Sequence, residues 1–148
     1  MNVTQKGQYA LRALFELAKR GSDAPVKGAE IAEAQAIPPR FLEVILNQLK
    51  QSGYVTSRRG AAGGYLLARP PDEVTVGDVL RTIQGPLDPV PCLEDERTAC
   101  ALYGRCVFLA LWQQVGAAVA GVLDGTTLAD LVESERRLAG GYVPCYVI

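Results

Sequence analysis

Residues 38–67, PPRFLEVILNQLKQSGYVTSRRGAAGGYLL, decide the fold. The prolines at 38 and 39 suit a first helical turn, where the missing N–H leaves no hydrogen bond unmade. Apolar side chains then recur at helical spacing to about Ser52, and Gly53 stops the helix. The face predicted to contact a core holds Phe41, Leu42, Ile45, Leu46 and Leu49. The opposite side carries Arg40, Glu43, Val44, Asn47 and Gln51.

A hairpin is predicted directly after this helix. Residues 54–57 and 65–68 have the apolar and β-branched character of short strands. The glycines of the connecting RRGAAGG segment allow positive φ and a close approach of the backbone. Arg58 and Arg59 lie at its root, followed by Gly60. The two arginines can pair with phosphate or reach into a minor groove. The sequence therefore predicts the wing of a winged helix, and an ordinary hairpin with solvated arginines is the alternative.

Two more helices are predicted before this stretch and one after it. Thr4 can cap a helix over residues 5–20, and a short helix over 27–34 follows. A tight turn joins the short helix to the one that starts at Pro39, as in a helix-turn-helix. Thr75 caps a further helix, whose inward-facing residues are predicted to be Val76, Val79, Leu80 and Ile83. Residues 1–85 are therefore predicted to form a winged helix-turn-helix DNA-binding domain, and the fold class is mainly α.

The segment 86–106 carries Cys92, Cys100 and Cys106 in a C-x7-C-x5-C pattern. Three thiolates suit the soft ligation of an iron–sulfur cluster or of zinc. Structural zinc normally has four protein ligands, often in C-x2-C pairs, so the wide spacing favours a cluster. Zinc and a metal-free thiol switch remain the alternatives. The fourth cysteine, Cys145, is either a further ligand or a buried apolar residue.

The stretch from residue 106 to residue 123 contains no charged side chain. We expect a helix over 101–123, with a stripe of apolar residues formed by Leu109, Trp112, Val115, Val119 and Val122 or Leu123. A membrane span is disfavoured by the central Gln113 and Gln114 and by the frequent Ala and Gly. The preceding domain is too small to cover such a helix, so a second copy is expected to bury it in a two-fold dimer. With the helix capped by Thr127, residues 101–138 form the predicted dimerisation region, and 139–148 a tail.

The amino-acid composition excludes several classes of function. The chain has 148 residues and no histidine, which removes His-based acid–base catalysis, nucleophile pairs and metal ligation. Residues 1–69 hold ten Lys/Arg and five Asp/Glu, a net +5, whereas the remainder holds five Arg and eleven Asp/Glu, a net −6. A basic first half predicts a polyanionic partner, double-stranded DNA. Charged residues interrupt the first apolar stretch, so no signal peptide is expected and the predicted location is cytoplasmic.

Together these motifs resemble the Rrf-two family of bacterial transcription regulators. The resemblance reaches about residue 135 and rests on Tyr9-Ala10-Leu11, Pro39-Arg40-Phe41-Leu42-Glu43, Arg58-Arg59-Gly60-x-x-Gly63-Gly64-Tyr65, the cysteine triplet and Thr127-Leu128-Ala129-Asp130-Leu131. It implies a dimeric winged-helix protein, not an enzyme, that binds an iron–sulfur cluster (4Fe-4S or 2Fe-2S) through three cysteines and one further ligand. The ligands would be Cys92, Cys100 and Cys106. DNA contacts would come from Arg40, Glu43, Val44 and Arg59.

The fourth ligand is not supplied by the family pattern. IscR-like members have a histidine three residues after the third cysteine, where this chain has Leu109, and NsrR-like members can use an acidic residue where it has Gln8. The cysteine spacing is closest to that of RirA-like members. The predicted function is a DNA-binding repressor whose cluster senses iron, redox state or nitric oxide. The competing hypotheses are a cluster-free regulator controlled by thiol oxidation or a partner protein, and an oxidoreductase or electron carrier that uses the cluster.

Overall fold

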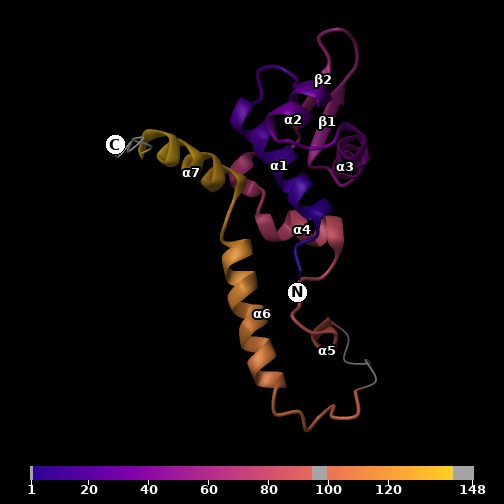
Figure 1. Cartoon of the computed structure of the whole chain (residues 1–148), viewed down its shortest axis with the longest axis vertical. Helices are drawn as coiled ribbons and strands as arrows, with labels where there is room; N and C mark the ends of the chain where they lie inside the picture. The colour runs from indigo at the N-terminus through magenta and orange to yellow at the C-terminus, as the bar shows by residue number, and fades with distance from the viewer. Residues whose placement is uncertain (1, 95–99, 142–148) are drawn as a thin grey trace, which may run out of the picture.

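The computed structural model describes residues 2–94 and 100–141 (Figure 1). Over these residues the chain is mainly helical with one two-stranded sheet, which confirms the predicted fold class. The elements, in chain order, are α1 (Gln5–Arg20), α2 (Gly28–Ala34), α3 (Pro39–Gln51), β1 (Val55–Arg58), β2 (Gly64–Leu67), the 3₁₀ turn η1 (Pro71–Glu73), α4 (Val76–Gln84), α5 (Pro91–Glu94), α6 (Leu109–Asp124) and α7 (Leu128–Gly141).

Local sequence signals account for the elements of the N-terminal half. The Thr4 hydroxyl accepts a hydrogen bond from the N–H of Gly7 at 3.0 Å and starts α1. Thr75 does the same for Asp78 at 3.2 Å and starts α4. Such a side-chain cap satisfies one of the N–H groups that a helix leaves unpaired at its first turn. The predicted bounds of these four helices and two strands lie within one residue of those observed.

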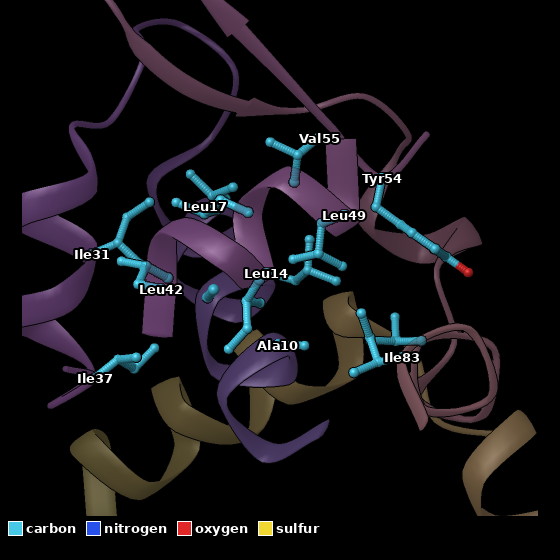
Figure 2. Packing of buried hydrophobic residues seen from close by; sticks show 14 of the residues in the cluster. Ala10, Leu14, Leu17, Ile31, Ile37, Leu42, Leu49, Tyr54, Val55 and Ile83 are labelled. Atoms are coloured by element: carbon cyan, nitrogen blue, oxygen red, sulfur yellow. The ribbon is translucent and has the colours of Figure 1, made fainter. Parts of the chain in front are cut away.

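One hydrophobic core joins α1, α2, α3 and the root of the hairpin (Figure 2). Leu14 of α1, Ile31 of α2, and Leu42 and Leu49 of α3 are each at most 2% exposed. Burying one such side chain stabilises a fold by about 1.5–3 kcal/mol. The core therefore fixes α3 by one face and leaves its other face to solvent.

The prediction that Phe41 faces the core is wrong, since this side chain is 62% exposed. The other four residues predicted for that face are buried. They already fill the stripe of α3 that meets the rest of the core. Phe41 lies about 100° around the helix axis from Leu42 and falls outside that stripe.

The hairpin is fixed to the segment that precedes α2. Its strands are antiparallel, with Val55 opposite Leu67 and Arg58 opposite Gly64. Val26 and Tyr65 exchange two backbone hydrogen bonds, at 2.9 and 2.8 Å. Gly64 has φ of 150°, and a Cβ there would lie 2.5 Å from the carbonyl oxygen of Val26. Only glycine fits this approach, so the glycine at 64 holds the wing against the helix-turn-helix.

The helix α6 begins at Leu109, not at residue 101 as predicted. Residues 101–105 form turns instead, and Gly104 has φ of 80°, which a continuous helix does not accommodate. None of the residues of α6 is fully buried, and the helix extends away from the core (Figure 1). The single-turn α5 was not predicted. No helix in the described ranges is both long and apolar enough to cross a membrane.

The C-terminal end of α6 is tied to α4. Both terminal nitrogens of Arg81 donate to the Asp124 carboxylate, at 2.8 and 2.9 Å. Gly77 makes room for this pair, because a Cβ there would overlap the carboxylate. The N–H of Val76 also donates to the carbonyl of Thr126 at 2.9 Å. These contacts fix the direction in which α6 leaves the domain.

The last helix, α7, returns to α1. Leu128 is fully buried and Val132 is 8% exposed. Farther along, Lys19 of α1 pairs with Glu135 at 3.1 Å. The chain thus passes through α6 and comes back to the N-terminal core.

Candidate nucleic-acid interface and cysteine loop

The outer face of α3 points into solvent. Arg40, Glu43 and Val44, the predicted DNA contacts on this helix, are all exposed. At the other end of the helix, Lys50 donates to the Ser57 hydroxyl at 2.6 Å and ties α3 to β1. The helix is therefore held by its core face and its last turn, with its first turns open to a partner.

The predicted wing residues lie where β1 enters the hairpin loop. Arg58, Arg59 and Gly60 are exposed. Gly60 has φ of 102°, and its carbonyl accepts from the N–H of Gly63 at 3.0 Å, which closes a tight turn. Within the described ranges no acidic side chain pairs with either arginine. Both guanidinium groups are thus available to phosphate, on a hairpin that stands next to α3 (Figure 1).

An ion pair between the exposed Arg20 and a buried carboxylate positions the helix-turn-helix. Glu16 is 3% exposed and accepts hydrogen bonds from Arg20 at 2.7 Å and from Gln35, in the turn after α2, at 2.8 Å. Burial raises the pKa of Glu16, but the hydrogen bonds from Arg20 and Gln35 outweigh it, so this pKa lies below its ordinary value. Sequence reasoning missed this site. The i, i+4 spacing of Glu16 and Arg20 was visible, but spacing alone does not reveal burial.

The last turn of α4 contacts three other elements. The Thr82 carbonyl accepts from the Gln48 amide of α3 at 3.3 Å. The Gln84 side-chain oxygen accepts from both the N–H and the hydroxyl of Thr4, at 3.0 Å each. Arg81 holds the end of α6, as described above. These contacts join residues 34 to 80 positions apart, so no local sequence signal could have found them.

The three candidate metal ligands lie between α4 and α6. Cys92 belongs to α5, and Cys106 precedes α6 by three residues. All three cysteines are free thiols, with Cys100 exposed and the other two half-buried. Among the described residues, no three Cys, Asp or Glu side chains come together as a metal site requires. The triplet thus lies on the segment between α4 and α6, with Cys92 in a helical turn, and its three side chains are not gathered at one point. Cys145 lies outside the described residues.

The chemistry of this loop fits an iron–sulfur cluster better than a hard cation. Its candidate donors are three thiols, in a chain without histidine. The loop also lies against α6, since a Cβ at Gly116 would be 3.3 Å from Pro89 and 3.9 Å from Leu93. Cys92 is next to Leu93, and Cys106 precedes the same helix. A ligand bound to both cysteines would therefore act on the start of α6.

An exposed recognition helix, a basic glycine-rich wing and a protruding apolar helix define a winged-helix DNA-binding protein. Residues 3–134 match the family model described as "Rrf2: Iron-dependent Transcriptional regulator". The chain belongs to the Rrf2 family, which confirms the resemblance seen in the sequence. It is accordingly a DNA-binding transcriptional regulator, in a family of regulators rather than enzymes.

Relatives named CymR and relatives named IscR are both similar to this chain over most of its length. CymR of Bacillus subtilis is 40% identical over 131 residues, which cover 88% of this chain and 89% of CymR. IscR of Serratia proteamaculans is 35% identical over 138 residues, or 93% of this chain and 83% of IscR. Among solved structures, CymR, described as the global cysteine regulator of B. subtilis, has a TM-score of 0.77 at 38% identity and covers 90% of this chain and 98% of its own. T. potens IscR has a TM-score of 0.77 at 32% identity, with coverages of 99% and 95%.

Proposed function

We propose that this chain is a cytoplasmic homodimeric repressor whose affinity for a two-fold DNA operator is controlled by an iron–sulfur cluster held by Cys92, Cys100 and Cys106. The observation that carries the proposal is the position of the three free thiols on the segment that joins α4 to α6. The iron-dependence in the family's description and the similarity to IscR support it. When bound, a 4Fe-4S or 2Fe-2S cluster supplies a centre sensitive to oxygen, nitric oxide and iron loss.

DNA would be bound by α3 and the wing. The exposed Arg40, Glu43 and Val44 would meet base edges in the major groove, as recognition helices do. Arg58, Arg59 and Gly60 would contact the backbone or the neighbouring minor groove. The net charge of +5 on residues 1–69 favours this orientation towards DNA.

The segment around α4 would couple the cysteines to DNA binding. The chain leaves α4 after Gln84 and enters the cysteine segment at once. The same turn of α4 hydrogen-bonds α3 through Thr82 and α1 through Gln84. A change in the cysteine segment therefore acts directly on the turn that holds both helices. This gives a contiguous physical connection, and coupling along it is a prediction.

A second copy would cover α6. Its exposed apolar residues include Leu111, 49% exposed, and Val122, 68% exposed, and two more precede the helix, Val107 and Phe108. Of the predicted stripe, Val122 is exposed, whereas the other members are half-buried within this chain: Leu109, Trp112, Val115, Val119 and Leu123. A dimer through α6 would place two recognition helices for the two half-sites of an operator.

The fourth cluster ligand is open among Cys145, an acidic residue of the loop, a group of the second subunit and an exogenous molecule. Leu109 stands where a histidine would be expected and cannot ligate iron. Replacing Cys145 by alanine separates the first possibility from the others, because only the first predicts that the cluster is lost.

The test is a comparison of anaerobically purified protein with its cysteine variants. We expect brown protein with bound iron and visible charge-transfer absorption. Cys92→Ala, Cys100→Ala and Cys106→Ala should each abolish the absorption and change operator affinity in the same direction as cluster removal does. Colourless anaerobic protein without iron would refute the cluster.

A thiol switch without metal is the second candidate. It is favoured by the exposed, free Cys100 and by the similarity to CymR, a cysteine regulator. In this case the colourless protein would lose or gain operator affinity on mild oxidation. A thiol reductant would restore it, and Cys100→Ala would not respond.

A further inference from the structure

The recognition helix carries two exposed apolar side chains that its own core does not use. Phe41 is 62% exposed and Val44 is 60% exposed. They are three residues apart on α3, so they lie on neighbouring turns of one side of the helix. Single exposed apolar residues are ordinary on a protein surface, but an adjacent pair on the face proposed to enter DNA is a candidate contact surface.

The pair borders a hollow between α3 and the start of α1. The hollow has a volume of about 410 Å³ and is lined by Gln5, Lys6, Tyr9, Phe41, Val44 and Ile45. Gln5 donates to the Tyr9 hydroxyl at 2.9 Å, so the polar groups of this wall are partly paired with each other. Lys6 is exposed. Apolar side chains thus meet a positive charge at the edge of the hollow.

This combination fits one surface in particular. In the major groove, the 5-methyl group of thymine is the apolar feature of a base edge, and phosphates flank it. Lys6 lines the same hollow, and the exposed Arg40 precedes Phe41 on α3, so two cations close to the apolar pair match those phosphates in charge. A purely apolar protein surface would leave both cations without a partner.

We infer that Phe41 and Val44 read the 5-methyl groups of thymines in the operator and are specificity-determining residues of this regulator. The inference rests on the proposed binding of DNA by α3 and not on the iron–sulfur cluster. The chemistry recognised is the methyl group itself. A 5-methylcytosine placed at the same position would therefore be accepted better than cytosine.

The experiment first selects an operator from a randomised duplex pool with the full-length protein. Each thymine of the selected site is then replaced singly by deoxyuridine, which removes the methyl group and leaves every hydrogen-bonding atom in place. At one or two positions per half-site we expect affinity to fall about three- to fivefold, the effect of uncovering one buried methyl group. Replacing the same thymine·adenine pair by 5-methylcytosine·guanine should retain more affinity than replacing it by cytosine·guanine.

Protein variants then assign the methyl groups to side chains. In Phe41→Ala and in Val44→Ala, deoxyuridine should no longer lower operator affinity at the position that the replaced side chain reads. Val44→Thr, which keeps one methyl group and the branched shape, should keep part of the effect. Both positions are exposed, so the alanine variants are expected to melt within a few degrees of the wild type, and thermal unfolding checks this.

Several results would overturn the inference. Deoxyuridine could cost nothing at any position, or it could cost the same in the wild type and in both variants. Phe41→Ala could instead change the oligomeric state without changing operator affinity, which would assign the surface to protein contacts. In each of these cases salt-dependent operator binding and brown colour would still support the proposed function. Failure to select any operator would refute both.

Discussion

Glu16 is the one charged residue that the core buries in the described part of the chain. We expect Glu16→Gln to lower the free energy of unfolding by about 1–3 kcal/mol, because hydrogen bonds to a charged group contribute about this much. The pKa of Glu16 is lowered in the folded state from an ordinary value of 4.5, so its contribution is present above that pH. It is lost as pH falls through the folded-state pKa. Denaturant unfolding should show a constant difference from wild type near neutrality that shrinks below about pH 4.5.

Glu30→Gln is the matched control. Glu30 also pairs with Arg20, at 3.3 Å, but its side chain is 49% exposed. An exposed pair contributes about 0–1 kcal/mol, so this variant should unfold almost as the wild type does. Equal effects of the two variants would contradict the special role of the buried carboxylate.

Arg59 is the wing side chain with the clearest predicted effect on DNA binding. Arg59→Ala should weaken operator binding by about 1–3 kcal/mol if the side chain reads the minor groove. If it contacts only phosphate, binding should weaken on all DNA sequences. The slope of the logarithm of the binding constant against the logarithm of the salt concentration should then fall in magnitude by about one. Fluorescence anisotropy over a series of salt concentrations measures both quantities. Arg136→Ala removes the same charge from α7, away from the wing (Figure 1), and should change neither. Binding independent of salt would contradict the electrostatic basis of the proposal.

At the level of elements, the last turn of α4 connects the cysteine segment to α3 and to the start of α1 by hydrogen bonds. Gln84→Met keeps the length of the side chain and removes the hydrogen bonds to the start of α1. We expect this variant to reduce the difference in operator-binding free energy between the cluster-bound and cluster-free states by about 0.5–2 kcal/mol. Anaerobic binding titrations of both states measure this difference. An unchanged difference would show that coupling does not pass through Gln84.

The same elements show what the sequence could predict. The bounds of α1, α3 and α4 follow from caps, prolines and apolar spacing, which are local, and the predictions were correct within one residue. The start of α6 was wrong because Gly104 adopts a left-handed conformation that composition does not reveal. Phe41 was wrongly predicted to face the core. The width of the buried face of α3 depends on the helices that pack against it, and the sequence of α3 alone does not reveal that width. The contacts of Glu16, Thr82 and Gln84 depend on residues brought together only by the fold.

For the whole molecule, the proposed dimer makes a direct prediction. Leu111 of α6 is 49% exposed. Leu111→Glu would place a charge in the interface, so we expect monomers in analytical ultracentrifugation and a loss of tight binding to a two-site operator. Binding to a single half-site should change much less.

Gln113→Glu adds the same charge two residues away, on a different side of α6. We expect it to remain dimeric. A dimeric Leu111→Glu protein would place the subunit interface elsewhere.

The pair between Arg81 and Asp124 closes a ring of 43 residue steps that contains all three described cysteines. Joining the ends of a chain reduces the volume that its middle explores, and so raises the effective concentration of the thiols towards one another. The closing pair is partly exposed, 38% for Arg81 and 44% for Asp124, and salt screens such a pair. The backbone hydrogen bond from Val76 to Thr126 joins the same two ends and is not screened in this way. High ionic strength should therefore weaken the ion pair but leave the ring closed, so the capture of a ligand that needs all three thiols should change little with salt.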